Sequence, residues 1–91
     1  MPVTVKLPTI LRPKVGGQPT VEGTGQTVGE LLADLEARYP GLTETIVTDD
    51  GGLHRFVNLY VNQEDVRYTG ALSAPVRDGD TVAILPAVAG G

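Results

Sequence analysis

The sequence predicts an α+β domain in which one helix covers one face of a mixed sheet of about five strands. Two observations support this fold class. Several short segments alternate apolar and polar residues, as half-buried strands do, whereas only one segment has its apolar residues at helical spacing. Because one helix cannot cover both faces of a sheet, the second face is left to solvent or to a partner.

The chain is expected to begin with two short strands joined by a loop. In VTVKL, the side chains of Val3, Val5 and Leu7 share one face, which is the pattern of a half-buried strand. The prolines and glycines of PTILRPKVGGQP interrupt any regular element, so this segment is predicted to be a loop. TVEG then predicts a second strand, at residues 20–23, that returns beside the first.

The helix is predicted in TVGELLADLEARYPG, where the apolar spacing changes from strand-like to helical. Thr27 and Glu30 are spaced as a capping box, in which each side chain accepts a hydrogen bond from the other residue's backbone N–H. Pro40 and Gly41 are expected to end the helix. The residues of its apolar stripe are Val28, Leu31, Leu32, Leu35 and Tyr39.

Three more strands are expected in the second half of the chain. RFVNLYVN alternates, and QED turns the chain into a short strand around Val66 and Arg67. RDGD is a tight turn in which Gly79 can take a positive φ, and it leads into the last strand, TVAIL. Pro86 ends this strand because proline has no N–H to donate to the ladder. The domain is therefore expected to span residues 1–86.

The composition excludes several classes of function. The chain has no cysteine, which excludes disulfides, thiolate metal sites, iron–sulfur clusters and covalent chemistry on a thiol. A net charge of −4 argues against nucleic acid or an anionic membrane as a partner, since both attract basic surfaces. No segment has the apolar length of a membrane span, and the first residues are too polar for a signal peptide. A cytoplasmic protein is expected.

The motifs that suggest chemistry have simpler explanations. GTGQTVG resembles a dinucleotide-binding fingerprint, but its third glycine comes one residue late and the chain is too short for the two halves of that fold. His54 is the only histidine, so it lacks the usual companions of a metal site. Ser73, the only serine, lies in an ordinary turn, and the paired acidic residues fit turns and hairpin tips. No catalytic residue, metal site or bound cofactor is predicted.

Longer segments carry a family resemblance. VNLYVNQEDV, DGDTVAILP and the terminal AVAGG resemble the ubiquitin-like sulfur carriers of the MoaD and ThiS type. LPTILRP and LHRFVN are similar, more narrowly, to the CysO-type carriers of cysteine biosynthesis. The resemblance covers nearly the whole chain and implies the β-grasp fold of ubiquitin. It also implies a protein co-substrate, which is not itself an enzyme.

Residues 87–91 then have a physical rationale as a flexible tail. A carboxylate must be activated before it can be attacked, for example as an acyl-adenylate, which requires threading the chain end through a narrow channel to ATP. Gly91 and Gly90 offer no side chain to block this approach, and Ala89, Val88 and Ala87 complete the threaded segment. Because the chain has no thiol to hold a persulfide, sulfur is expected on the Gly91 carboxylate, as a thiocarboxylate.

The resemblance implies a set of protein partners. An ATP-dependent adenylyltransferase of the ubiquitin-activating type would activate Gly91, and a rhodanese-type persulfide would supply the sulfur. A pyridoxal-phosphate cysteine synthase would accept it, and a zinc-dependent peptidase of the JAMM type would release cysteine. Three alternatives remain open: a molybdopterin-synthase small-subunit (MoaD-like) carrier, a covalent modifier joined through Gly91 to lysines, and a plain interaction module.

A docking surface follows from the strand alternation. If Val57, Leu59 and Val61 face the helix, the residues between them face away, and the same alternation applies to the last strand. An apolar patch is therefore expected beside the tail as the docking site of the adenylyltransferase. The predicted patch consists of Phe56, Tyr60, Ala83 and Leu85.

Overall fold

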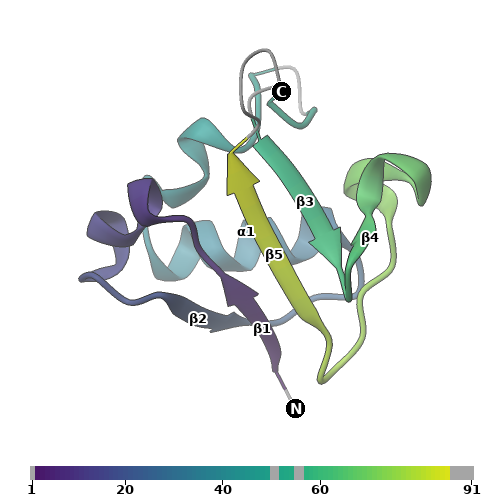
Figure 1. Cartoon of the computed structure of the whole chain (residues 1–91), viewed down its shortest axis with the longest axis horizontal. Helices are drawn as coiled ribbons and strands as arrows, with labels where there is room; N and C mark the ends of the chain where they lie inside the picture. Colours follow the sequence, from purple (N-terminus) through teal and green to yellow (C-terminus); the bar gives the residue numbers. More distant parts are fainter. Residues whose placement is uncertain (1, 50–51, 55–56, 87–91) are drawn as a thin grey trace.

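Five strands form one mixed sheet in the order β2-β1-β5-β3-β4 (Figure 1). This arrangement comes from a computed structural model, which describes residues 2–49, 52–54 and 57–86. The strands are β1 (Val3–Lys6), β2 (Thr20–Gly23), β3 (Val57–Val61), β4 (Glu64–Asp65) and β5 (Thr81–Pro86).

The last strand occupies the middle of the sheet. β5 runs parallel to β1, with Val82 beside Val5, and antiparallel to β3, with Ile84 beside Leu59. The hairpins β1–β2 and β3–β4 are antiparallel and extend the sheet on either side. The predicted fold class, a β-grasp with a mixed sheet of about five strands, is confirmed.

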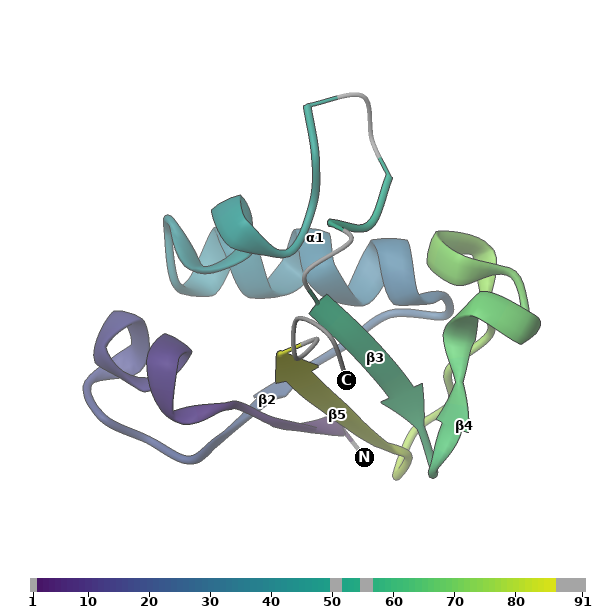
Figure 2. The same cartoon turned by 45° about the horizontal axis from the view of Figure 1, so that its top comes forward.

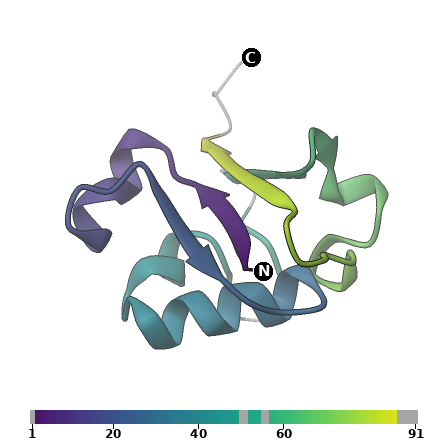
Figure 3. The same ribbon diagram turned by 90° about the horizontal axis from the view of Figure 1, so that it is seen from below.

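One face of the sheet is covered by α1 (Val28–Arg38), as Figures 2 and 3 show from two further directions. Leu31 and Leu35 of the predicted stripe have no exposed surface. The Thr27 side chain caps the helix by accepting a hydrogen bond from the Glu30 N–H at 3.1 Å. The second bond of the capping box differs from the prediction, because Glu30 accepts from the backbone N–H of Gln26 instead of Thr27.

The segment predicted to be a loop after β1 is instead a 3-10 helix, η1 (Thr9–Val15). Leu11 and Val15 lie four residues apart, and both are buried, so this turn adds a second apolar contribution to the core. Pro13 lies inside this helix, where the fixed φ of proline is compatible with helical backbone although proline has no N–H to donate. Gly16 ends the helix in the left-handed region, at φ 70°.

The fourth strand also differs from its prediction. Pairing with β3 is confined to β4, and the residues expected to be extended form the 3-10 helix η3 (Val66–Tyr68). The cause is local, because the Asp65 side chain accepts a hydrogen bond from the Arg67 N–H at 2.9 Å and so starts a helical turn. Val66 is fully buried, which anchors this turn in the core.

Two further short helices connect the main elements. η2 (Leu42–Thr45) follows α1, and η4 (Ala71–Ser73) packs against α1. The core is purely hydrophobic, and no polar or charged side chain is buried among the described residues. Within the same residues, no helix is long and apolar enough to cross a membrane.

Candidate functional site

The predicted site residue Gly91, with the threading residues Gly90, Ala89, Val88 and Ala87, lies outside the described residues. The structure places the point from which this segment starts. β5 ends at Pro86, which pairs with Val57 of β3, and β1 supports the other edge of the strand. The tail therefore starts where β5 is still paired with β3, whereas β1 pairs with the earlier residues of β5, from Thr81 to Ala83.

The two faces of β5 differ as the alternation predicts. Val82 and Ile84 point into the core and are 0% and 1% exposed. Ala83 is half-buried on the opposite face, and Leu85, next to the start of the tail, is 47% exposed. α1 does not cover this second face, here called the open face (Figure 3).

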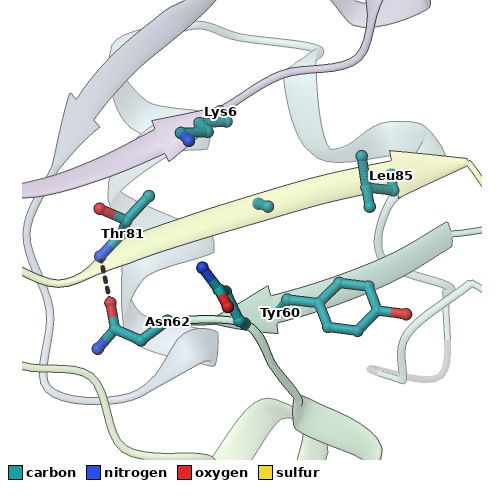
Figure 4. A pocket seen from close by; sticks show the side chains of 7 residues that line it. Lys6, Tyr60, Asn62, Thr81 and Leu85 are labelled. Carbon is teal, nitrogen blue, oxygen red and sulfur yellow. Dashed lines mark hydrogen bonds between the residues drawn. The ribbon is translucent and has the colours of Figure 1, made fainter.

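Three of the four predicted patch residues come together on the open face. Tyr60 of β3 lies directly beside Ala83 in the sheet register, and both are half-buried. Leu85 lies two positions farther along β5, beside Asn58. Figure 4 shows Tyr60 and Leu85 on these neighbouring strands. Phe56, the fourth residue, lies outside the described part of the chain.

The open face contains a shallow depression of about 530 Å³. Its end near the tail is apolar, formed by Leu85, Ala83 and the Tyr60 ring, whereas its other members are polar (Figure 4). Sequence reasoning missed the polar members, although Lys6 and Thr81 alternate with buried neighbours and could have been assigned to this face. The missed residues are Lys6, Asn62, Gln63 and Thr81.

A hydrogen-bond network fixes the polar end of the depression. The Asn62 side chain accepts from the Thr81 N–H at 3.0 Å and donates to Asp80 Oδ1 at 3.0 Å. Asp80 Oδ2 accepts from the Arg77 N–H at 2.9 Å. The bond from Asn62, followed by that from Arg77, lowers the pKa of the Asp80 carboxyl below its ordinary value. This network holds the start of β5 against the end of β3.

The other sequence motifs belong to the framework of the fold. A Cβ added to Gly25 would lie 2.6 Å from the backbone nitrogen of Leu31, so this glycine permits the close approach of the chain to α1. His54 is half-buried, and its backbone N–H donates a hydrogen bond to the Ile46 carbonyl at 2.8 Å. Ser73 ends η4 and is exposed. In the described ranges, no three His, Asp or Glu side chains gather as metal ligands.

A family model described as the ThiS family matches residues 5–91, which include β5 and the tail. This chain belongs to the ThiS family. It is a ubiquitin-like domain of the ThiS and MoaD type, and the β-grasp topology agrees with this assignment.

Known members of the ThiS family resemble this chain along its whole length. The sulfur carrier protein CysO of Mycobacterium tuberculosis is 56% identical over 93 residues, which cover 100% of both chains. A crystal structure of the Amycolatopsis orientalis BexX/CysO complex contains a chain that is 55% identical, with a TM-score of 0.91. That match covers 98% of this chain and 99% of the other.

Another relative, named as a modifier, is the small archaeal modifier protein 3 of Haloferax volcanii. It is 38% identical over 65 residues, which cover 71% of this chain and 70% of that protein. The relatives of this chain therefore include proteins named as sulfur carriers and a protein named as a modifier.

Proposed function

We propose that this ThiS-family chain is a sulfur carrier protein whose Gly91 carboxylate is adenylated and converted to a thiocarboxylate that donates sulfur for cysteine biosynthesis. The observation that carries the proposal is the 56% identity, along the whole of both chains, to a protein named as the sulfur carrier CysO.

The chemistry takes place at the end of the tail. A Gly91 carboxylate oxygen attacks the α-phosphorus of ATP, and pyrophosphate leaves. A persulfide sulfur of the partner then attacks the acyl carbon and displaces AMP. A thiol then attacks the partner's sulfur in the resulting acyl persulfide, forms a disulfide with it and releases the thiocarboxylate. Since this chain has no cysteine, both the persulfide and the thiol come from other molecules.

The length of the tail limits how far a partner that acts on Gly91 can lie from the end of β5. Five residues follow Pro86, and they span at most about 17 Å when extended. A protein that holds Gly91 in its active site therefore comes within that distance of Pro86, and the exposed Leu85 beside Pro86 is available for contact with it. We assign the patch of Phe56, Tyr60, Ala83 and Leu85 as the docking surface of an adenylyltransferase of the ubiquitin-activating type.

Later steps use other partners. We propose that a pyridoxal-phosphate cysteine synthase takes the sulfur from the thiocarboxylate and that a JAMM-type zinc peptidase frees the product from Gly91. A MoaD-like carrier would instead give its sulfur to a molybdopterin precursor. The identity to CysO favours the cysteine route.

A second candidate function is covalent modification of proteins. The 38% identity to an archaeal modifier protein favours it, because the same activated Gly91 can be attacked by a lysine amine instead of a sulfur nucleophile. Both functions need the same adenylation step, so they differ only in the acceptor.

Intact mass spectrometry separates these functions. After incubation with the adenylyltransferase, ATP and a sulfur source, we expect one oxygen of the carrier to be replaced by sulfur, with the change in the C-terminal peptide. A variant without Gly91 is the control and should stay unloaded. Loading of that variant would refute the carrier assignment, and isopeptide links from Gly91 to lysines would favour the modifier. Unloading by a molybdopterin precursor alone would change the pathway and retain the carrier.

A further inference from the structure

The turn between β3 and β4 has an unusual second residue. Val61 pairs with Glu64, so only Asn62 and Gln63 connect the two strands. Both have positive φ, at 49° and 75°. This is the pattern of a type I′ turn, in which glycine is strongly preferred at the second position because a side chain there is strained.

The strain at Asn62 is compensated within the molecule, but the strain at Gln63 is not. Asparagine tolerates the left-handed region, and the Asn62 side chain makes hydrogen bonds to the Asp80 carboxylate and the Thr81 N–H. The Gln63 side chain is exposed and makes no hydrogen bond to any described residue. Glycine would stabilise the fold at this position, so the glutamine side chain brings no gain inside the free protein.

Gln63 lies where a docked partner would meet it. It lines the polar end of the depression on the open face, together with Lys6 and Thr81. The apolar end of the same depression contains Leu85, from which the tail departs. A partner that covers Leu85 and extends along the depression reaches Gln63, whose carboxamide has two donors and an acceptor.

We propose that Gln63 is a contact residue for the activating adenylyltransferase, retained at the expense of folding stability because its carboxamide hydrogen-bonds to the docked enzyme. The partner group that fits is a backbone amide or another carboxamide, since these groups both donate to and accept from a carboxamide. This inference rests on the proposed function and extends the docking surface beyond the predicted patch to the β3–β4 turn.

Three variants separate the backbone from the side chain. Gln63→Gly removes both the strain and the carboxamide, whereas Gln63→Ala removes the carboxamide and keeps the strain. Ala71→Gly is the matched control, because Ala71 also has a positive φ, 53°, but lies in η4 and does not line the depression. We expect Tm to rise by roughly 2–6 °C in Gln63→Gly and Ala71→Gly, and not in Gln63→Ala.

Adenylation kinetics give the second measurement. With the carrier as the varied substrate, Gln63→Gly and Gln63→Ala should each raise KM by about 3- to 10-fold, the range expected for one lost hydrogen bond, and leave kcat unchanged. Ala71→Gly should leave both constants unchanged. Wild-type KM values for both Gln63 variants would overturn the inference while the carrier function stands. A wild-type protein that is never adenylated would overturn the carrier function and this inference with it.

Discussion

Asn62 and Thr81 bind each other in both directions. The Asn62 N–H donates to the Thr81 carbonyl at 2.8 Å, and the Thr81 N–H donates to the Asn62 side-chain oxygen at 3.0 Å. One side chain therefore continues the ladder between β3 and β5 by one rung after β3 has ended. This rung lies at the polar end of the depression on the open face.

Replacing Asn62 with alanine should lower the free energy of unfolding by roughly 2 kcal/mol, because the Thr81 N–H loses its acceptor and alanine is strained at positive φ. Urea denaturation at neutral pH measures the loss. Asn58→Ala, in the preceding strand β3, is the matched control and should change stability by less than about 0.5 kcal/mol. Equal losses in the two variants would contradict the assigned role of the rung.

Glu36 makes the connection after α1 sensitive to acid. Its carboxylate accepts from the N–H of Gly41 at 2.6 Å, and from the hydroxyl and N–H of Thr43 at 2.7 and 3.0 Å. The bond from Gly41, then those from Thr43, lower the pKa of Glu36 below its ordinary value of 4.5. Since the folded state has the lower pKa, the stabilisation is complete above the ordinary pKa and is lost as the pH falls through the folded-state pKa.

Urea denaturation at pH 7 and pH 3 tests this dependence. Glu36→Gln should be less stable than the wild type at pH 7, and the difference should shrink at pH 3 as the wild-type carboxylate is protonated. Glu22→Gln, at an exposed position of β2, is the control and should show a smaller difference at pH 7. A difference for Glu36→Gln that is the same at both pH values would show that its carboxylate charge is irrelevant.

Leu85→Glu should weaken binding of the adenylyltransferase by at least about tenfold, because it buries a charge in the apolar part of the interface. Leu85 is exposed in the free protein, so the thermal midpoint should change little. Titration calorimetry gives the affinity. Tyr68→Glu is the control, because Tyr68 is also an exposed apolar side chain but does not line the depression. Unchanged affinity in Leu85→Glu would place the docking surface elsewhere.

Gly90→Leu should abolish adenylation, since a bulky side chain blocks close approach of the chain to the nucleotide. The fold should be intact because the substitution lies beyond β5. ATP–pyrophosphate exchange measures activation, and circular dichroism checks the fold. Val88→Ala, which makes the tail thinner, is the control and should retain exchange. Normal exchange in Gly90→Leu would show that the tail does not enter a narrow channel.

The sequence predicted the elements whose apolar residues have a regular period. Val3 and Val5 identified β1, and Leu31 and Leu35 identified α1, because strand and helix periods are both visible in the residues themselves. The 3-10 helix at residues 9–15 was missed because a short helical turn leaves no such period. It forms because tertiary burial of its apolar residues outweighs the prolines and glycines around them.

The same distinction applies to the open face. Tyr60, Ala83 and Leu85 could be placed on it from alternation along two strands. Alternation could also place Lys6 and Thr81 on this face, but not show that they share one depression, because Lys6 joins it only when β1 lies beside β5. Gln63 joins it only when the turn after β3 is limited to two residues. The first condition is a pairing between segments distant in sequence, and the second is the length of a turn. Neither can be read from the periodicity of apolar residues in a single segment.

The position of β5 between β1 and β3 links the reactive tail to the folding of the whole domain. During synthesis, a chain that has reached residue 80 has its two hairpins but lacks the strand that joins them. The apolar residues of this incomplete chain cannot pack into one core, so the chain is unfolded and open to proteolysis. The tail emerges from the ribosome only after this central strand. Every chain with an intact tail therefore already contains the segment needed to fold, and chains that end before β5 have neither the fold nor the reactive end.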